Sequence, residues 1–228
     1  ILTYIEGDMY AKTRINNEIE KSLGKVLASQ TNQLLSFIHK EAIRKFDWNP
    51  SNIKWTKKFL ILFNGSKKEL IKDAIYQHDH FVYKNIKNLK HSVTHGDPND
   101  YNLVVKKDRI NGLIDFGDSI YAPSINDLAI GLSYALMSSK NLYQTLKNIV
   151  SEYNDIYPIS SNEIYSLLGL IKSRLLITLV MATKQRKKYP DNKYLSISEK
   201  NAWSLMSKLY KIDPYFFIAV IRKICNLE

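Results

Sequence analysis

The stretch His95-Gly96-Asp97-Pro98-Asn99-Asp100-Tyr101-Asn102 lies near the middle of the chain and is followed by Gly112-Leu113-Ile114-Asp115-Phe116-Gly117-Asp118. Together the two stretches collect carboxylate and amide side chains beside turn-forming residues. Phosphoryl transfer needs one carboxylate to orient an acceptor hydroxyl and take its proton. It also needs oxygen ligands for a divalent metal, because Mg²⁺ prefers such ligands. The two stretches can supply both.

The spacing of these residues strengthens this interpretation. Asn102 follows Asp97 by five positions, as the metal-binding Asn follows the catalytic Asp in protein kinases. Asp115 ends the apolar strand expected over 110–114 and opens the sequence Asp-Phe-Gly, a metal-binding motif of kinases. Each motif alone is weak, since Asp, Asn, Pro and Gly also form ordinary turns. In this order, 18 residues apart and bridged by a predicted hairpin, they indicate a phosphotransferase.

Hydrophobic periodicity predicts a mostly α-helical α+β fold with a small central β-hairpin. Strands are expected over 1–5, 91–94, 102–105 and 110–114. Helices are expected over 16–38, 53–63, 67–89, 123–137, 142–153, 160–187, 196–210 and 214–227. Ser66 is the expected N-cap of the third helix, and Ser160 with Glu163 forms the expected capping box of the sixth.

Composition sets broad limits on the function. The chain has 228 residues, 45% of them apolar, and the apolar run at 175–182 is too short to span a bilayer. A single cysteine, Cys225, excludes an internal disulfide and fits the cytoplasm. The net charge of +11 admits a nucleic-acid partner, but the lysines are scattered and no recognition signature accompanies them. We therefore expect neither a nucleic-acid nor a membrane partner.

The segment His95–Asp118 resembles the aminoglycoside phosphotransferase and choline kinase superfamily. Within it the resemblance is to hydroxylysine kinases and to phosphotransferase domains fused to class III aminotransferases. The run 112–119 and its continuation through 126–135 are typical of that branch. The opening Leu2–Gly7 resembles its hinge strand. The resemblance implies a protein-kinase-like C-terminal lobe, with residues 1–7 as a hinge strand and 8–228 as the catalytic lobe.

The resemblance also implies roles for single residues. It makes Asp97 the catalytic base and Asn102 and Asp115 the ligands of Mg²⁺, and it gives His95 a bracing role in the loop. Asp127 is expected either to cap its helix or to brace the same loop.

Four further sets of residues are candidates for contact with substrate or nucleotide. Asp118 is expected either to contact a substrate ammonium or to cap a turn, and the sequence favours neither role over the other. Asp100 is a candidate substrate contact. Trp48 either lines a pocket or packs in the core. Thr3, Tyr4 and Ile5 are expected to contact the nucleotide at the hinge.

The implied activity is transfer of the γ-phosphoryl group of ATP or GTP to a hydroxyl of a small amine or amino acid. The chain departs from the family in lacking a Gly-rich loop and a strand Lys with a helix Glu partner. We expect these in an N-terminal lobe before Ile1, so the 228 residues alone should be inactive. The alternative is a degenerate member that binds nucleotide or a partner without catalysis.

Overall fold

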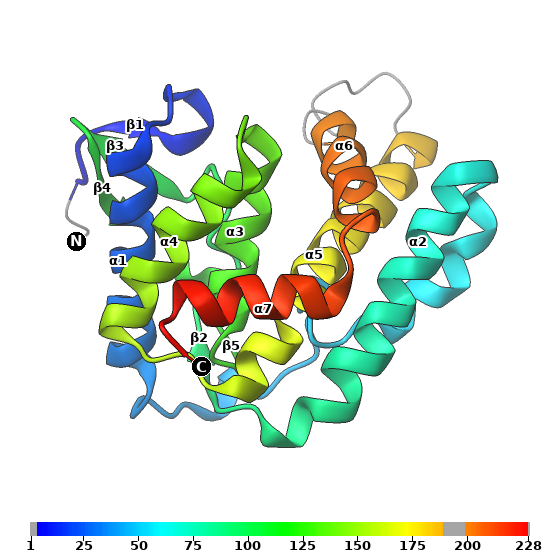
Figure 1. Ribbon diagram of the computed structural model, residues 1–228, viewed down its shortest axis with the longest axis horizontal. Coiled ribbons are helices and arrows are strands. Elements are labelled where there is room, and N and C mark those ends of the chain that lie inside the picture. Colours follow the sequence, from blue (N-terminus) through cyan, green and yellow to red (C-terminus); the bar gives the residue numbers. More distant parts are fainter. Residues whose placement is uncertain (1–3, 189–198, 228) are drawn as a thin grey trace.

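Helix α5 (Ser161–Lys188) runs through the middle of the structure (Figure 1). The computed structural model describes residues 4–188 and 199–227. Helix α5 contacts α2 (Gly65–Gln77), α3 (Asn126–Ser138), α6 (Glu199–Tyr210) and α7 (Pro214–Ile224). The capping box predicted at the start of α5 is confirmed, because the Glu163 carboxylate accepts from Ser160 N–H at 2.8 Å and Glu163 N–H donates to Ser160 Oγ.

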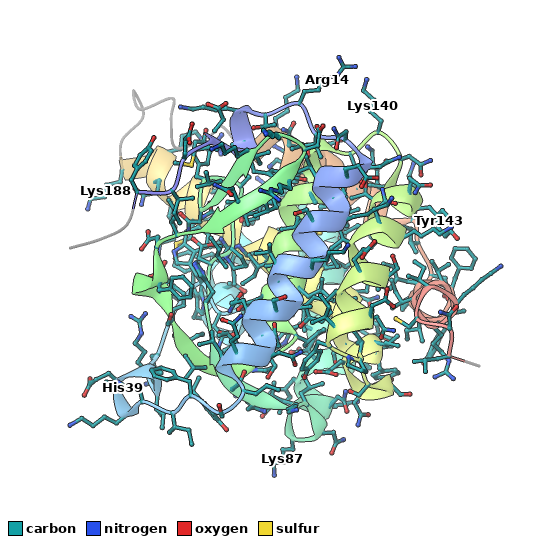
Figure 2. The ribbon with its side chains drawn as sticks, turned by 90° about the vertical axis from the view of Figure 1, so that its left-hand side faces the viewer. Arg14, His39, Lys87, Lys140, Tyr143 and Lys188 are labelled. Carbon is teal, nitrogen blue, oxygen red and sulfur yellow. The ribbon has the colours of Figure 1, made fainter. Side chains whose placement is uncertain are left out.

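Helices α1 (Asn17–Leu34) and α4 (Leu142–Ile156) lie side by side and form one flank of the molecule (Figure 1). In the view of Figure 2, α1 faces the reader and runs between the end marked by Arg14 and the end marked by His39. The side chain of Asn16 accepts the Ile19 N–H and caps α1, which ends at Leu34 and so stops short of its predicted end at residue 38.

Five short strands form two antiparallel sheets in the described residues. One has the order β1-β3-β4, and the other pairs β2 with β5. The bounds are β1 Asp8–Met9, β2 His91–Thr94, β3 Leu103–Lys106, β4 Arg109–Leu113 and β5 Ile120–Pro123. The loop at 95–102 connects β2 to β3, and the loop at 114–119 connects β4 back to β5. Both loops therefore cross between the same two sheets, which places the two motif segments together.

Two local predictions were wrong, and two predicted helices are present but differ in helical type. Residues Tyr4–Glu6 form no strand, and the first described strand is β1, while residues 1–3 lie outside the described part. The N-cap of α2 is Asn64 and not Ser66. The helix predicted over 67–89 is a succession of three helical types, and that predicted over 53–63 is a 3-10 helix. These segments are α2, the π-helix η4 (His78–Val82), and the 3-10 helices η5 (Tyr83–Asn88) and η3 (Lys54–Leu62).

Helix α5 is also unusually apolar. In the part of the chain that the structure describes, Ser161–Arg186 is the one stretch long and apolar enough to cross a membrane, although its uninterrupted apolar runs are much shorter. The structure buries 89% of its apolar window, as expected for the central helix of a folded core.

Candidate active site

Asp127, the second residue of α3, holds the start of the 95–102 loop. Its carboxylate accepts the backbone N–H of His95 at 2.7 Å and that of Gly96 at 3.0 Å, and Gln30 donates to it at 2.9 Å. Burial raises the pKa of Asp127, and these three donors oppose the rise. The helix-cap alternative is wrong, because the N-cap of α3 is Ile125 and no side chain caps it. Asp127 instead braces the loop.

His95 is fully buried, and both ring nitrogens are engaged. The N–H of Asp97 donates to Nδ1 at 3.2 Å, so Nε2 carries the proton and donates to the carbonyl of Ile114 at 2.9 Å. The ring thus ties one motif loop to the other. Gly96 has a φ of 87° and lies so close to the Asp118 carbonyl that a Cβ would collide with it.

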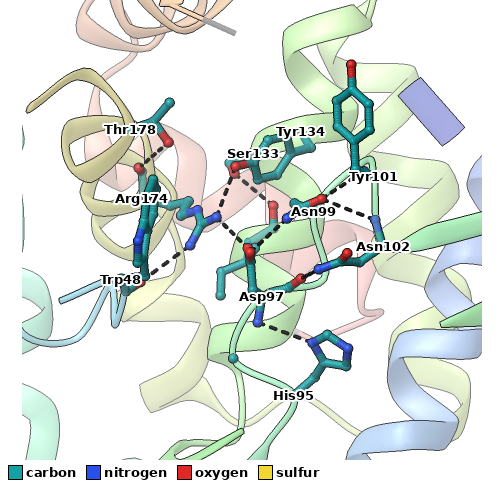
Figure 3. Close-up of polar contacts among 12 residues, drawn as sticks. Trp48, His95, Asp97, Asn99, Tyr101, Asn102, Ser133, Tyr134, Arg174 and Thr178 are labelled. Atoms are coloured by element: carbon teal, nitrogen blue, oxygen red, sulfur yellow. Dashed lines mark hydrogen bonds and ion pairs between the residues drawn. The ribbon is translucent and has the colours of Figure 1, made fainter. Parts of the chain in front are cut away.

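The carboxylate of Asp97 is held at both oxygens (Figure 3). Oδ1 accepts from Arg174 Nη2 at 2.5 Å, and Oδ2 accepts from Asn99 Nδ2 at 2.7 Å. The side chain retains 16% exposure, whereas that of Arg174 retains 1%. Each carboxylate oxygen has a second lone pair, so the group can still accept a bond from a hydroxyl.

Arg174 is a functional candidate that lies far outside the two motif segments in the sequence. Its guanidinium lies over the Trp48 ring at 4.7 Å from the centroid and donates to the Tyr134 hydroxyl at 2.9 Å (Figure 3). Contacts with Tyr134 and Asp97 raise the pKa of Arg174 although burial opposes its charge. The available sequence signal is a pair of cations, Lys172 and Arg174, which are the charged residues of the largely apolar stretch 164–182.

Asn102 and Asp115 lie on adjoining backbone segments, since the N–H of Ile114 donates to the carbonyl of Asn102 at 3.0 Å. Asn102 Nδ2 donates to the Asp97 carbonyl at 2.9 Å, which leaves its amide oxygen for a ligand. Asp115 is exposed and lies in the left-handed region at φ 66°. Among the described residues, its carboxylate accepts one long hydrogen bond, 3.4 Å from the Gly117 N–H.

One amide oxygen and one carboxylate therefore remain for a hard cation, which fits a Mg²⁺ that keeps several waters or phosphate oxygens. Residues 4–188 and 199–227 contain no group of three or more His, Cys, Asp or Glu side chains that could hold a metal by themselves. The donor set thus fits a metal shared with a phosphorylated ligand and does not form an all-protein cage.

Two further carboxylates lie close to Asp97. Burial raises the pKa of Asp100 to about 6, and the charge of Asp97 adds to the rise. Burial also raises the pKa of Asp118, with repulsion from Asp97 and Asp115 adding to it. Asp115, and not Asp118, accepts the hydrogen bond that caps the turn, so the turn-cap alternative for Asp118 is not observed. The site is acidic in a protein whose net charge is +11.

The remaining predicted residues are placed as follows. Trp48 is partly buried, packs against the core and stacks on Arg174, as the core alternative expected. Thr3 lies outside the described residues. Tyr4 is 84% exposed, and Ile5 lies over Gly112 of β4. Among the contacts that the structure describes, none joins Tyr4 or Ile5 to Asp97 or to the residues that bind it.

The profile of a family described as "Phosphotransferase enzyme family" matches residues 1–148. The chain belongs to this family. Among curated relatives, the hydroxylysine kinase of Mus musculus is 27% identical over 228 residues, covering 92% of this chain and 60% of the relative. The hydroxylysine kinase of Xenopus laevis is 27% identical over 227 residues, covering 92% and 61%. The chain therefore spans about 60% of the length of the curated relatives it matches.

Solved structures of small-molecule kinases share the fold of this chain. A microcompartment-associated aminopropanol kinase matches with a TM-score of 0.63 at 14% identity, covering 98% of this chain and 66% of that one. The amicoumacin kinase hAmiN, solved with AMP-PNP, Ca²⁺ and Ami, matches with a TM-score of 0.61 at 13% identity, covering 92% and 65%. At these identities the likeness shows the protein-kinase-like phosphotransferase fold, within which the described chain is mostly helical with small sheets.

Proposed function

We propose that this chain carries the catalytic residues of a kinase that transfers the γ-phosphoryl group of ATP or GTP to a hydroxyl of a small amine or amino acid. The observation that carries the proposal is the placement of Asp97. Its carboxylate is fixed by Arg174 and Asn99 and stands beside Asn102 and Asp115 on loops that cross between the same two sheets. Family membership supports a phosphotransferase reaction in general.

In the proposed mechanism Asp97 accepts a hydrogen bond from the acceptor hydroxyl and directs its lone pair toward the γ-phosphorus. A bond forms between the hydroxyl oxygen and phosphorus, the bond to the bridging oxygen of the nucleoside diphosphate breaks, and the hydroxyl proton passes to Asp97. Arg174 and Asn99 keep the carboxylate in one orientation throughout. Mg²⁺, held by the Asn102 amide oxygen and the Asp115 carboxylate, would neutralise charge on the phosphates.

The proposed acceptor carries an amine because the site presents negative charge that Arg174 does not balance. Asp100 and Asp118 lie close to Asp97, and neither carboxylate receives a hydrogen bond from a side chain of the described residues. An ammonium group would compensate such charge, whereas an anionic acceptor would be repelled. The hydroxylysine kinase relatives support this class of acceptor.

We also propose that an N-terminal lobe outside the 228 residues supplies the Gly-rich loop and the Lys–Glu pair that hold the nucleotide phosphates. Residues 1–7 would form the hinge to that lobe. Two facts support this: the sequence contains no Gly-rich loop with a following Lys and Glu pair, and it spans about 60% of the length of its curated relatives.

The buried thiol of Cys225 suits a reducing compartment, and we propose the cytoplasm as the location of the protein.

The decisive experiment is a phosphoryl-transfer assay with ATP and GTP against hydroxylysine, ethanolamine, choline, homoserine and aminoglycosides. It should be run on the 228-residue chain and on the same chain joined to its N-terminal lobe. We expect turnover of a hydroxylated amine in the longer protein only. Nucleotide binding without transfer to any acceptor would favour the non-catalytic alternative, and turnover by the 228 residues alone would refute the proposed need for the second lobe.

A further inference from the structure

A small cavity of about 170 Å³ adjoins the 95–102 loop, which we call the catalytic loop because it carries the proposed base. The loop contributes Asp100 and Tyr101, the 3-10 turn η1 (Tyr10–Lys12) contributes Tyr10, helix α3 contributes Tyr134, and helix α6 contributes Asn201. The cavity is smaller than pockets for drug-sized ligands, which span roughly 300–1,000 Å³. It can therefore admit one end of a small molecule but no multi-ring ligand.

One polar group at this cavity has no hydrogen-bond partner in the described residues, and a second has only a backbone partner. The hydroxyl of Tyr10 is buried without a hydrogen-bond partner among the described residues, and its side chain is only 3% exposed. The carboxylate of Asp100 accepts a hydrogen bond from its own backbone N–H but none from any side chain that the structure describes, although most of its surface is withdrawn from water. Unsatisfied buried polar groups are rare in folded proteins, so the Tyr10 hydroxyl, beside a carboxylate with no side-chain partner, indicates a missing ligand.

The cavity is linked to the catalytic base. Arg174 Nη2 donates both to Asp97 Oδ1 and to the hydroxyl of Tyr134, and Tyr134 lines the cavity. The N–H of Ala11 donates to the Asp100 carbonyl at 2.9 Å and fixes that part of the loop against η1. Asp97 and Asp100 are three residues apart, so their Cα atoms are separated by at most about 10 Å.

The chemistry of the lining selects the ligand. A carboxylate and a phenol oxygen both accept hydrogen bonds, and an ammonium group offers three donors and no acceptor. A neutral alcohol would leave the Asp100 charge uncompensated, and an anion would be repelled by both Asp97 and Asp100. Hydrogen bonds between ionised partners are the strong ones, so a buried carboxylate–ammonium contact would dominate affinity.

We propose that this cavity is the subsite for the ammonium group of the phosphoryl acceptor, with Asp100 as its counter-ion and Tyr10 as a second hydrogen-bond acceptor. The proposal rests on the proposed kinase function. It requires the amine and the reacting hydroxyl to lie a few bonds apart in one small molecule, because Asp97 and Asp100 share one short loop.

Binding to the 228-residue chain tests the subsite without requiring turnover. The probes are 1-amino-2-propanol and hydroxylysine, compared with 2-butanol, which replaces the ammonium of aminopropanol by a methyl group. Affinity is measured by calorimetry and by NMR shifts of the Asp100 and Tyr10 amides. The variants are Asp100→Asn, Tyr10→Phe and, as a matched charge control, Asp155→Asn on the exposed face of α4. Thermal melting verifies that each variant folds.

We expect the amines to bind and 2-butanol not to bind. Asp100→Asn should weaken amine binding by about ten- to a hundredfold, Tyr10→Phe by roughly fivefold, and Asp155→Asn should leave it unchanged. Equal binding of 2-butanol, or unchanged amine affinity in Asp100→Asn, overturns the subsite. The transfer assay separates the two proposals: a kinase indifferent to Asp100→Asn refutes the subsite alone, whereas amine binding at Asp100 without any transfer refutes the kinase alone.

Discussion

Arg174 Nη2 and Asp97 Oδ1 are 2.5 Å apart, and the two residues are separated by 77 positions in the sequence. The pair joins the middle of α5 to the loop that carries the proposed base. Because the guanidinium is almost fully buried, water cannot solvate its charge if the Asp97 carboxylate is removed. Removing either partner therefore leaves the other charge uncompensated.

Arg174→Met should destabilise the protein by about 3 kcal/mol, because it leaves Asp97 partly buried without its cation. Lys21→Met on α1 is the control, since the side chains of Lys21 and its partner Glu18 are 40% and 65% exposed, and it should cost under about 1 kcal/mol. Urea unfolding measures both. Combining Arg174→Met with Asp97→Asn should recover part of the loss, and strictly additive losses would contradict the pairing.

Asp97→Asn should lower turnover of the complete enzyme by about 10²–10⁴-fold, because an amide oxygen orients the hydroxyl but takes its proton poorly. The acceptor KM should change little. The assay uses the nucleotide and acceptor found in the transfer screen, with Asp155→Asn as the control. A turnover near that of the wild type would show that Asp97 is not the base, and circular dichroism would show that the variant is folded.

Asp127→Asn should loosen the start of the catalytic loop, because an amide offers one acceptor oxygen where the carboxylate uses two for His95, Gly96 and Gln30. We expect the amides of His95 and Gly96 to exchange with solvent at least about tenfold faster, while amides within α5 keep their protection. Hydrogen exchange followed by NMR gives both rates. Unchanged exchange at His95 and Gly96 would mean that the loop does not depend on Asp127.

Mn²⁺, used as a paramagnetic substitute for Mg²⁺, should broaden the resonances of Asn102 and Asp115 before those of other residues when nucleotide is present. Asp115→Asn should abolish this selective broadening because it removes the anionic ligand. Asp108→Asn, in the turn between β3 and β4, removes the same charge and should leave the broadening in place. Broadening centred on other residues would relocate the metal.

Stability should fall as the pH drops through 6.5, in part because of His78. Burial lowers the pKa of His78 below its usual 6.5, and its ring nitrogen Nε2 pairs with the Ser51 carbonyl at 3.0 Å. The unfolded chain therefore takes up a proton that the folded one resists, so this contribution is present above pH 6.5 and is lost below it.

His78→Gln should flatten the pH dependence of the unfolding free energy between pH 7.5 and 5.5, whereas His80→Gln, at a less buried position in the same π-helix, should leave it as in the wild type. Denaturant titrations at several pH values provide the comparison. Parallel curves for the wild type and His78→Gln would rule out this contribution.

The motif loops were predictable because their chemistry is local. The order Asp97, Asn102, Asp115 and the capping box of Ser160 and Glu163 are each written within a short stretch of chain. The chain also signalled its long helices by periodicity, although it did not mark where α1 unwinds or where α2 passes into a π-helix.

What the sequence could not reveal depends on contacts between distant positions. Strand β5 exists because it pairs with β2, and β1 is only two residues long. Arg174 meets Asp97 only once α5 has packed against the loop, and the unpartnered Tyr10 at the cavity follows from the same assembly. The role of Asp127 in bracing the loop, and not in capping its helix, likewise depends on where strand β2 ends.

The apolar surface of α5 has a consequence for how the protein reaches a single structure. A helix that is apolar on every side can rotate or slide within a core at little cost, since hydrophobic contact is non-directional. Lys172 and Arg174 remove that freedom, because each meets its carboxylate, Asp73 at 2.7 Å and Asp97 at 2.5 Å, in one alignment only. A rotated or shifted α5 would bury both cations without partners, so the ion pairs that reject such misfolded states also set the geometry of the proposed base.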